Sequence, residues 1–510
     1  MYPNVSTRSV LVATLVLIVS TWTACSKTSA GGNTTPSSDA SKVAITTKSN
    51  DARAEFLQGR DLSEKLLAQD SLQHFDKAIA LDPDFATAEL ARANNSPTAK
   101  EFFEHLNKAV SLADKSSDGE KLFILATEAA ANGDLVKQKD ALDKLVAEYP
   151  NDERAHFILG NYYFAQQNFG LAAEEYKKAT ELAPSYSPAY NILGYAYRQQ
   201  GDYADAEQAF KKYIELIPSD PNPYDSYGEL LLKMGRFDDS IAQYRKALSI
   251  DPHFMPSHFG ISADLMYMGK PAKASDELQQ MANQARNDGE LRTALFGMAV
   301  VAADTGNFDK AVQQLDKQYA VAEKKNDVAA MAADLQAKGN ILAQTPNLDL
   351  AKQQFDRSLQ LIEGSNLSQE IKDNAKLIHH YNLAGLDIRK KDYAAAKQEA
   401  EEFRQGVALS KNPAQLKQAH ELDGRIALAE KDYDKAIAEL QQANQQDPRN
   451  LFLLSQAYQA KGDSTKAKEL CTKAAEFYSL PQLNYAFVRV KAQKNGSRHE
   501  SLTSGGHWAG

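Results

Sequence analysis

Cysteine is nearly absent from this chain of 510 residues, which has only Cys25 and Cys471. Two cysteines cannot form a framework of disulfides, so packing alone must hold the fold together in an oxidising compartment. Cys471 falls among regularly spaced apolar residues, where a small buried side chain is the expected role and a reactive thiol is not.

Motifs of catalysis are also missing. The sequence has no phosphate-binding glycine loop, no Gly-x-Ser-x-Gly elbow and no His-Glu-x-x-His zinc motif. The pair His379-His380 and the run Glu101 to His105 contain metal-capable side chains, but neither has the spacing of a metal site. We therefore predict no enzyme, no catalytic residue, no metal and no cofactor. A hydrolase accessory with hidden chemistry would instead lose activity when His379 or His380 is changed.

Positive charge is in deficit. The chain has 58 Lys and Arg residues against 67 Asp and Glu residues, which gives a formal net charge of −9. An acidic protein without a long basic stripe is not expected to have nucleic acid as its main partner. Hydrophobic residues make up 43% and charged residues 25%, which is the balance of a folded protein and excludes a disordered chain.

What the chain does contain is a set of prolines that recur at a regular spacing. Pro150, Pro184, Pro218 and Pro252 stand 34 residues apart, and a fixed spacing of this length is the signature of a stacked repeat protein. With each proline at position 32 of a unit, positions 8 and 20 hold small residues and position 24 holds an aromatic one. Small residues let two antiparallel helices approach closely, so we predict that each unit forms a helix hairpin. The residues at positions 8 and 20 are Gly160, Gly194 and Gly228, and Ala172, Ala206 and Ser240.

A turn is predicted between the two helices of each unit. The turn has the sequence Gly201-Asp202-Tyr203, Gly235-Arg236-Phe237 or, where glycine is missing, Gln167-Asn168-Phe169. Glycine supplies the left-handed residue that ends a helix. The proline at position 32 then stops the second helix, because it has no amide hydrogen to donate.

This order of small and large residues resembles the tetratricopeptide repeat (TPR). The match is strong over residues 153–254 and good over 52–85; beyond Pro252 the spacing lengthens, but hairpins are predicted to continue to residue 476. The resemblance implies an all-α protein, a right-handed superhelix of roughly ten helix hairpins. In the later units the position-20 residues are Ala274, Ala311, Ala351, Ala396, Ala436 and Ala467.

The resemblance to TPR proteins also implies where a partner binds. In that family the first helices of the hairpins line a concave groove. Aromatic side chains among amides and charges suit a peptide or a partner helix, although the same residues could simply form a solvated polar lining. The predicted groove residues are Arg154, Phe157, Asn161, Phe164, Asn191, Tyr195, Arg198, Asp225 and Glu229.

The N-terminus has a different signal. Arg8 precedes the apolar run Val10 to Val19, and small residues and Cys25 follow, an order typical of a secretory signal peptide. The run is too short to cross a bilayer, which needs about 20 residues. The cysteine after Thr-Ala resembles the lipobox of bacterial lipoproteins, which implies cleavage before Cys25 and acylation of it. In lipoproteins of Gram-negative bacteria, an aspartate directly after the cysteine typically retains the protein at the inner membrane. Here that residue is Ser26, so the resemblance favours the outer membrane.

Five segments are therefore predicted. They are a signal peptide at 1–24, a flexible tether at 25–50, an N-terminal array at 51–254, a C-terminal array with a capping helix at 255–490, and a disordered tail at 491–510. The predicted function is that of a non-enzymatic, lipid-anchored scaffold on the periplasmic face of the outer membrane, with other envelope proteins or peptides as partners. The alternative is a soluble periplasmic or secreted protein that binds peptide or polysaccharide directly.

Overall fold

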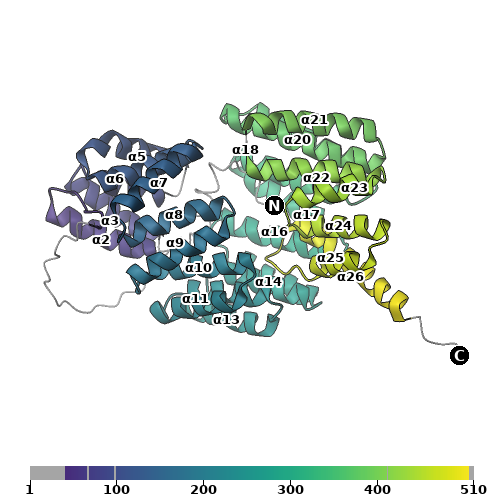
Figure 1. Cartoon of the computed structure of the whole chain (residues 1–510), viewed down its shortest axis with the longest axis horizontal. Coiled ribbons are helices and arrows are strands. Elements are labelled where there is room, and N and C mark those ends of the chain that lie inside the picture. Colours follow the sequence, from purple (N-terminus) through teal and green to yellow (C-terminus); the bar gives the residue numbers. More distant parts are fainter. Residues whose placement is uncertain (1–40, 66–67, 97–98, 411, 505–510) are drawn as a thin grey trace. The chain divides into compact units, whose positions relative to one another are not determined.

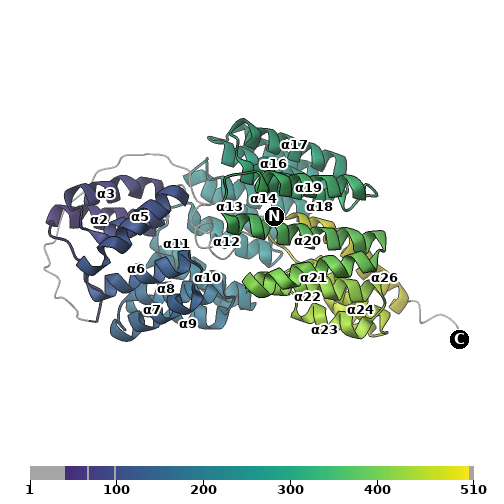
Figure 2. The same ribbon diagram turned by 90° about the horizontal axis from the view of Figure 1, so that it is seen from above.

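The structure is a computed structural model that describes residues 41–65, 68–96, 99–410 and 412–504. These residues form 25 α-helices, one 3-10 turn and no strand. Helices pair into hairpins, and within each of two compact units successive hairpins lie side by side (Figures 1 and 2). The predicted all-α repeat architecture is therefore confirmed. The predicted signal peptide, Cys25, the tether up to residue 40 and the last six residues lie outside the described residues.

The chain divides into two compact units, and the division passes through helices α12 and α13. Described residues up to Leu230, together with Lys246–Phe254, form the N-terminal unit, and Leu231–Arg245 with the residues from Met255 onward form the C-terminal unit. The helices up to the division are α2 (Asn50–Glu64), α3 (Ala68–Leu81), α4 (Ala86–Asn94), α5 (Ala99–Leu112), the 3-10 turn Ala113–Lys115, α6 (Asp118–Ala131), α7 (Leu135–Glu148), α8 (Glu153–Ala165), α9 (Phe169–Leu182), α10 (Ser187–Gln200), α11 (Tyr203–Leu216), α12 (Asn222–Lys233) and α13 (Phe237–Ile250).

The later helices belong to the C-terminal unit. Helices α2 to α25 make twelve hairpins in the described residues, more than the roughly ten expected, because the short pair α4–α5 and the long pairs after α15 are all complete hairpins. The bounds are α14 (Met255–Tyr267), α15 (Pro271–Asn283), α16 (Asp288–Asp304), α17 (Phe308–Lys324), α18 (Val328–Leu342), α19 (Leu348–Glu363), α20 (Gln369–Lys390), α21 (Tyr393–Ser410), α22 (Pro413–Ala429), α23 (Tyr433–Gln442), α24 (Pro448–Ala460), α25 (Ser464–Ala475) and α26 (Leu483–Ser504).

Left-handed residues form the predicted turns within the hairpins. Gly201 and Gly235 have φ angles of 84° and 73°, a conformation that glycine adopts without strain. Gln167 takes the same place with φ 59°. The next residue then caps the second helix: the side chains of Asp202 and Asn168 accept hydrogen bonds from backbone amides three residues further on.

Close approach of the paired helices explains the small residues. A Cβ atom on Gly160 would lie 2.6 Å from the ring of Tyr176, and one on Gly194 would lie 2.8 Å from the ring of Phe210; Gly228 is buried as well. All nine position-20 residues named above are at most 1% exposed. The four prolines each follow the end of a second helix by two residues, so they stop these helices as predicted.

The last helix, α26, is longer than the predicted capping helix. It extends to Ser504, whereas we predicted a disordered tail from residue 491. Ala492 is fully buried, and its carbonyl oxygen accepts a hydrogen bond from the Sγ of Cys471 at 3.2 Å. The apolar period ends near Val490, so the sequence contained no signal that this helix continues.

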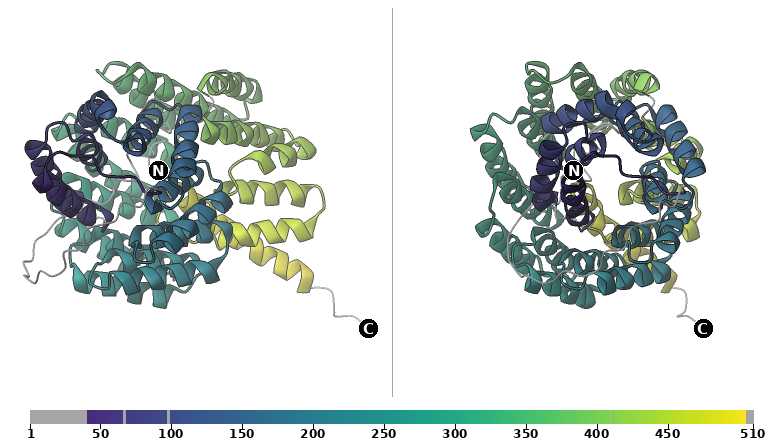
Figure 3. Two further views of the ribbon diagram at one scale, coloured as in Figure 1. Left: turned by 60° about the vertical axis from the view of Figure 1, so that its left-hand side comes forward. Right: turned by 90° about the vertical axis from the view of Figure 1, so that its left-hand side faces the viewer.

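Helix α26 also closes the C-terminal unit. It lies beside the hairpin α24–α25 (Figure 3) and contacts α16, near the start of the same unit. Leu483 and Phe487 pack into a core formed with α16, α17 and α18. Arg489 Nε lies 2.8 Å from Asp304 Oδ1, although 185 residues separate them in sequence. The first part of α26 thus packs against helices near the beginning of the C-terminal unit.

Asp264 on α14 should make the stability of this unit depend on pH. Its side chain is fully buried, and burial raises the pKa of its carboxyl to about 8, although Ser240 beside it acts in the opposite direction. A carboxyl whose folded pKa is raised favours folding most below its unfolded pKa of about 4. That contribution decreases progressively as the pH rises from about 4, and it is gone above the folded pKa of about 8.

We expect Asp264→Asn, which keeps the shape but cannot ionise, to stabilise the C-terminal unit at pH 7 to 8 by a few kcal/mol and to have little effect at pH 4. Urea unfolding at both pH values measures this. Asp276→Asn, an exposed change on the neighbouring helix, is the control and should be neutral at both. Equal effects of Asp264→Asn at pH 4 and pH 8 would show that this carboxyl is not held protonated.

Candidate functional site

The predicted groove residues lie on three successive first helices, α8, α10 and α12. None of them is exposed; all are partly or fully buried. The structure brings five of them together in two clusters that join different first helices. The other four make contacts within their own hairpins or lie buried.

The first cluster joins α10 to α12. The hydroxyl of Tyr195 donates to Glu229 Oε2 at 2.7 Å, and the guanidinium of Arg198 lies 3.3 Å from the same carboxylate. The Arg198 Cζ atom also stands 4.6 Å from the centre of the Tyr195 ring, a favourable cation–π contact. Burial, together with the charge of Glu229, raises the pKa of Tyr195 well above its ordinary value, so the phenol keeps its proton as a donor.

The second cluster joins α8 to the first helix of the unit. Arg154 Nε donates to Glu64 Oε1 on α2 at 2.8 Å, across 90 residues of sequence. The Arg154 guanidinium and the Phe157 ring both pack against Tyr186, at 5.2 and 5.5 Å. Glu64 and Tyr186 were missed by the sequence analysis, because their partners depend on how the row of hairpins curves.

The remaining predicted residues make local contacts. Asn161 Oδ1 accepts a hydrogen bond from the hydroxyl of Tyr176 at 2.8 Å, and Phe164 packs edge-on against Phe169 at 5.2 Å. Asn191 and Asp225 are only 6% and 8% exposed. Much of the predicted groove lining therefore holds neighbouring helices together, while the side chains of Tyr195, Arg198 and Glu229 stay partly exposed.

A second surface was not predicted: the starts of α4, α6 and α8 hold an extended stretch of the chain, residues 41–49. Burial alternates along it, with Val43, Ile45 and Thr47 partly buried and the residues between them exposed. This is the period of a strand. Residues 41–49, which we predicted as part of a flexible tether at 25–50, therefore lie against the N-terminal unit.

Three carboxylates hold the backbone of this segment. The amide of Val43 donates to Asp152 Oδ2 at 3.0 Å, the amide of Thr46 to Glu120 Oε1 at 2.9 Å, and the amide of Lys48 to Asp82 Oδ2 at 3.0 Å. We call Asp82, Glu120 and Asp152 the acidic ladder. They are 8%, 2% and 6% exposed, respectively, and each belongs to a different hairpin.

Two of the three ladder residues belong to helix starts, whereas Asp82 directly follows the end of α3. Asp152 caps α8, since its Oδ1 accepts from two backbone amides there, and Glu120 forms a capping box with Ser117 on α6. A helix N-terminus favours a nearby negative charge. The hydroxyl of Thr47 holds the pKa of Asp82 below its ordinary value, while burial opposes this. The second oxygens of these carboxylates are therefore available to the segment.

Two apolar side chains and one lysine of the segment also fit the N-terminal unit. Val43 lies over Gly119. A Cβ atom added to Gly119 would be 2.6 Å from a methyl group of Val43. Ile45 packs against the core that contains Phe56. Lys42 Nζ lies 2.8 Å from Glu153 Oε2. The alternation of Val43 and Ile45 was a signal of an extended segment in the sequence, but their partners lie too far along the chain to be inferred.

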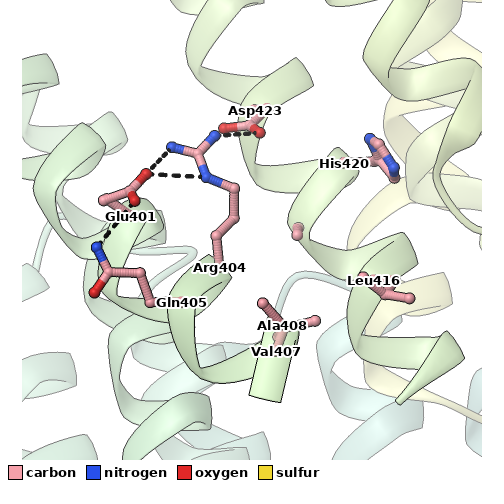
Figure 4. Close-up of a pocket in the computed structure, with 9 residues that line it drawn as sticks. Glu401, Arg404, Gln405, Val407, Ala408, Leu416, His420 and Asp423 are labelled. Carbon is pink, nitrogen blue, oxygen red and sulfur yellow. Dashed lines mark hydrogen bonds and ion pairs between the residues drawn. The ribbon is translucent and has the colours of Figure 1, made fainter. Parts of the chain in front are cut away.

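The hollow shown in Figure 4 lies between α21 and α22 and measures about 400 Å³. Arg404 on its wall is paired with Glu401 and with Asp423. His420, also on the wall, has its Nδ1 2.7 Å from Glu439 Oε2. None of the residues that line it is a serine, threonine or cysteine, so the lining contains no hydroxyl or thiol nucleophile.

The histidines considered as metal ligands have separate partners. His379 Nε2 lies 3.3 Å from Asp356 Oδ1, whereas His380 Nδ1 lies 2.6 Å from Glu399 Oε2. His105 pairs with Glu89 at 2.6 Å. In the part of the chain that the structure describes, no three His, Cys, Asp or Glu residues are grouped as a metal site.

A recurring histidine–glutamate pair was also missed. In four hairpins, a histidine at position 4 of the repeat unit, on the first helix, contacts a glutamate 19 residues later, at 2.6 to 2.7 Å. The repeated spacing was visible in the sequence. Each pair joins the two helices of one hairpin, so its role is structural. The pairs are His156–Glu175, His258–Glu277, His380–Glu399 and His420–Glu439, and Glu55–His74 is the reversed form.

No described helix combines the length and the apolar character needed to pass through a bilayer.

Comparisons with known proteins identify part of the repeats. Tetratricopeptide repeat models match residues 153–186, 187–220, 222–254 and 448–479, so these four stretches are TPRs. No curated protein sequence matches the chain.

Solved structures resemble parts of the chain. A structure of MamA is 23% identical and covers 33% of this chain and 91% of its own, with a TM-score of 0.30. YrrB, described as a TPR protein with an unusual peptide-binding site, is 22% identical, covering 36% and 92%, with a TM-score of 0.26. PilF of Pseudomonas aeruginosa is 19% identical, covering 43% and 96%, with a TM-score of 0.31. Such scores carry no argument about function.

Proposed function

We propose that this protein of tetratricopeptide repeats is a non-enzymatic scaffold of the bacterial cell envelope that binds other proteins or peptides. The observation that carries the proposal is the stack of hairpins itself: it presents first-helix side chains from several repeats side by side, among them Tyr195, Arg198 and Glu229. An aromatic ring next to paired charges provides both an apolar anchor and partners for a peptide backbone.

The proposal includes a lipid anchor on Cys25, placed on the periplasmic face of the outer membrane. Its support is the resemblance of the sequence before Cys25 to a lipobox, and Ser26 directly after it. The second candidate is a soluble periplasmic or secreted protein that binds peptide or polysaccharide directly. Both candidates share the repeats and differ in the state of the mature N-terminus.

One experiment tests both parts in intact cells. A photo-crosslinking residue is placed at Gln199, beside the Arg198 cluster, and as a control at Lys177, which is exposed on the second helix α9. We expect discrete crosslinks to envelope proteins from position 199 and few from position 177. Equal labelling at both positions would contradict binding through the first helices.

The same purified protein reports on the anchor by mass spectrometry. We expect its N-terminal peptide to begin at Cys25 and to have the mass of an acylated cysteine, and Cys25→Ser to prevent both. An unmodified chain that begins elsewhere would support the soluble alternative instead. Because the two readouts are separate, the scaffold and the anchor can fail independently.

A further inference from the structure

We propose that the acidic ladder is a second peptide-binding site, which residues 41–49 occupy in the resting chain and from which a partner can displace them. The partner is an extended segment of another protein with a lysine followed by β-branched residues at alternate positions. This site is distinct from the predicted groove, and the inference depends on neither the groove nor the lipid anchor.

The site binds the segment largely through hydrogen bonds to its backbone, so peptides of different sequence can use the same bonds. Besides the three amides on the ladder, the carbonyl of Ala44 accepts from the hydroxyl of Ser117 at 3.1 Å and the carbonyl of Ile45 from the guanidinium of Arg53 at 3.1 Å. These groups exist in every extended peptide. Recognition of an added strand through its main chain, with alternate side chains in pockets, is a recurring mode of peptide binding.

Side-chain contacts define which segments fit. The space over Gly119 fits a small branched side chain such as that of Val43. Two residues later, the apolar core that contains Phe56 fits a second branched side chain, that of Ile45. Glu153 pairs with a lysine directly before the first of them. Side chains at the positions of Ala44 and Thr46 are exposed, so their identity matters little. The chemistry that fits is therefore Lys, then Val or Ile, any residue, and Val or Ile.

The ladder carboxylates keep other hydrogen bonds when the segment leaves; for Asp82 this is the bond from the amide of Asp84. Asp152 and Glu120 are held by the helix starts that they cap, so losing the segment does not remove their other hydrogen bonds. The segment itself is held mainly by side chains. One described backbone–backbone hydrogen bond ties it to a later hairpin, from the amide of Asn151 to the carbonyl of Ser41 at 3.3 Å. With few buried contacts, it should open locally well before the unit unfolds.

A peptide-binding experiment on the full mature chain tests this. In Val43→Asp with Ile45→Asp, charges replace the two apolar anchors and should release the segment. The probe is a labelled synthetic peptide with the sequence Ser-Lys-Val-Ala-Ile-Thr-Thr-Lys-Ser. We expect it to bind the released variant at least tenfold more tightly than the unaltered chain, where the site is occupied and the attached segment competes at high effective concentration.

Two controls define the site. A peptide with the same two aspartate substitutions should not bind, and Gly119→Ala added to the released variant should weaken binding, because its Cβ fills the seat of the valine. Circular dichroism establishes that each variant is folded. If the folded, released variant binds the peptide no better than the unaltered chain does, the segment is a fixed part of the fold and the proposal is wrong.

Hydrogen exchange of the unaltered chain decides the case even if the variants unfold. Local release predicts that the amides of Val43, Thr46 and Lys48 exchange at least tenfold faster than those in the middle of α8. If these three amides exchanged only when the amides of the helix do, the proposed displacement of the segment would be wrong.

Discussion

Replacing Gly194 by alanine is expected to destabilise the N-terminal unit by about 1–3 kcal/mol, as an overpacked core residue does. The added Cβ would lie 2.8 Å from two carbons of the Phe210 ring. That ring is fully buried and packs against Tyr195 at 5.2 Å, so it cannot move aside without disturbing α10. Urea unfolding followed by circular dichroism measures the effect, and Gly194→Leu should abolish folding of this region.

Gly170 provides the matched control, one hairpin earlier. It lies exposed in the first turn of α9, and the nearest atom to an added Cβ is 3.9 Å away. Since alanine is the better helix former, Gly170→Ala should be neutral or stabilise by up to about 1 kcal/mol. If both alanine variants lost the same stability, close helix approach would not be the reason for glycine at position 8.

The second large effect is expected from Asp304→Asn, which should loosen α26 from α16. The Asp304 side chain is 2% exposed and its partner Arg489 14%, and removing one member of a buried ion pair costs about 3–5 kcal/mol. Burial by itself lowers the pKa of Arg489, but its hydrogen bonds with Asp304 outweigh this and raise it. The variant would therefore keep a buried cation with only a neutral amide beside it.

Hydrogen exchange and urea unfolding would both report the loss. We expect faster exchange along the described start of α26 and reduced stability of the C-terminal unit, whereas Asp309→Asn, exposed on α17, should change stability by less than about 0.5 kcal/mol. Asp304→Leu combined with Arg489→Met should recover much of the loss, because it removes both charges together. Unchanged exchange in α26 after Asp304→Asn would mean that apolar packing alone holds the helix.

The sequence predicted the hairpins because the interactions that form a hairpin are local. Gly194 and Phe210 are 16 residues apart, and the turn at Gly201 lies between them. Each unit therefore contains both sides of its own contact. Even the turn at Gln167, which has no glycine, was placed correctly, because its neighbours keep the pattern.

What the sequence could not predict are contacts between distant repeats. Arg154 meets Glu64 across 90 residues, and Arg489 meets Asp304 across 185. Such pairs depend on the curvature that many small packing angles add up to, and no single repeat contains that information. The helix positions of the groove residues could thus be predicted, but their pairing could not, and the acidic ladder was missed altogether.

The docking of residues 41–49 determines how far a membrane anchor could reach. Ser41, the first residue that the structure describes, lies beside Asn151, just before α8. For a protein acylated on Cys25, the 15 residues 26–40 would span at most about 50 Å. Release of the docked segment would add nine residues, roughly 30 Å more, and move the attachment point to α2. A partner that occupied the ladder would thereby also lengthen the linker between lipid and scaffold.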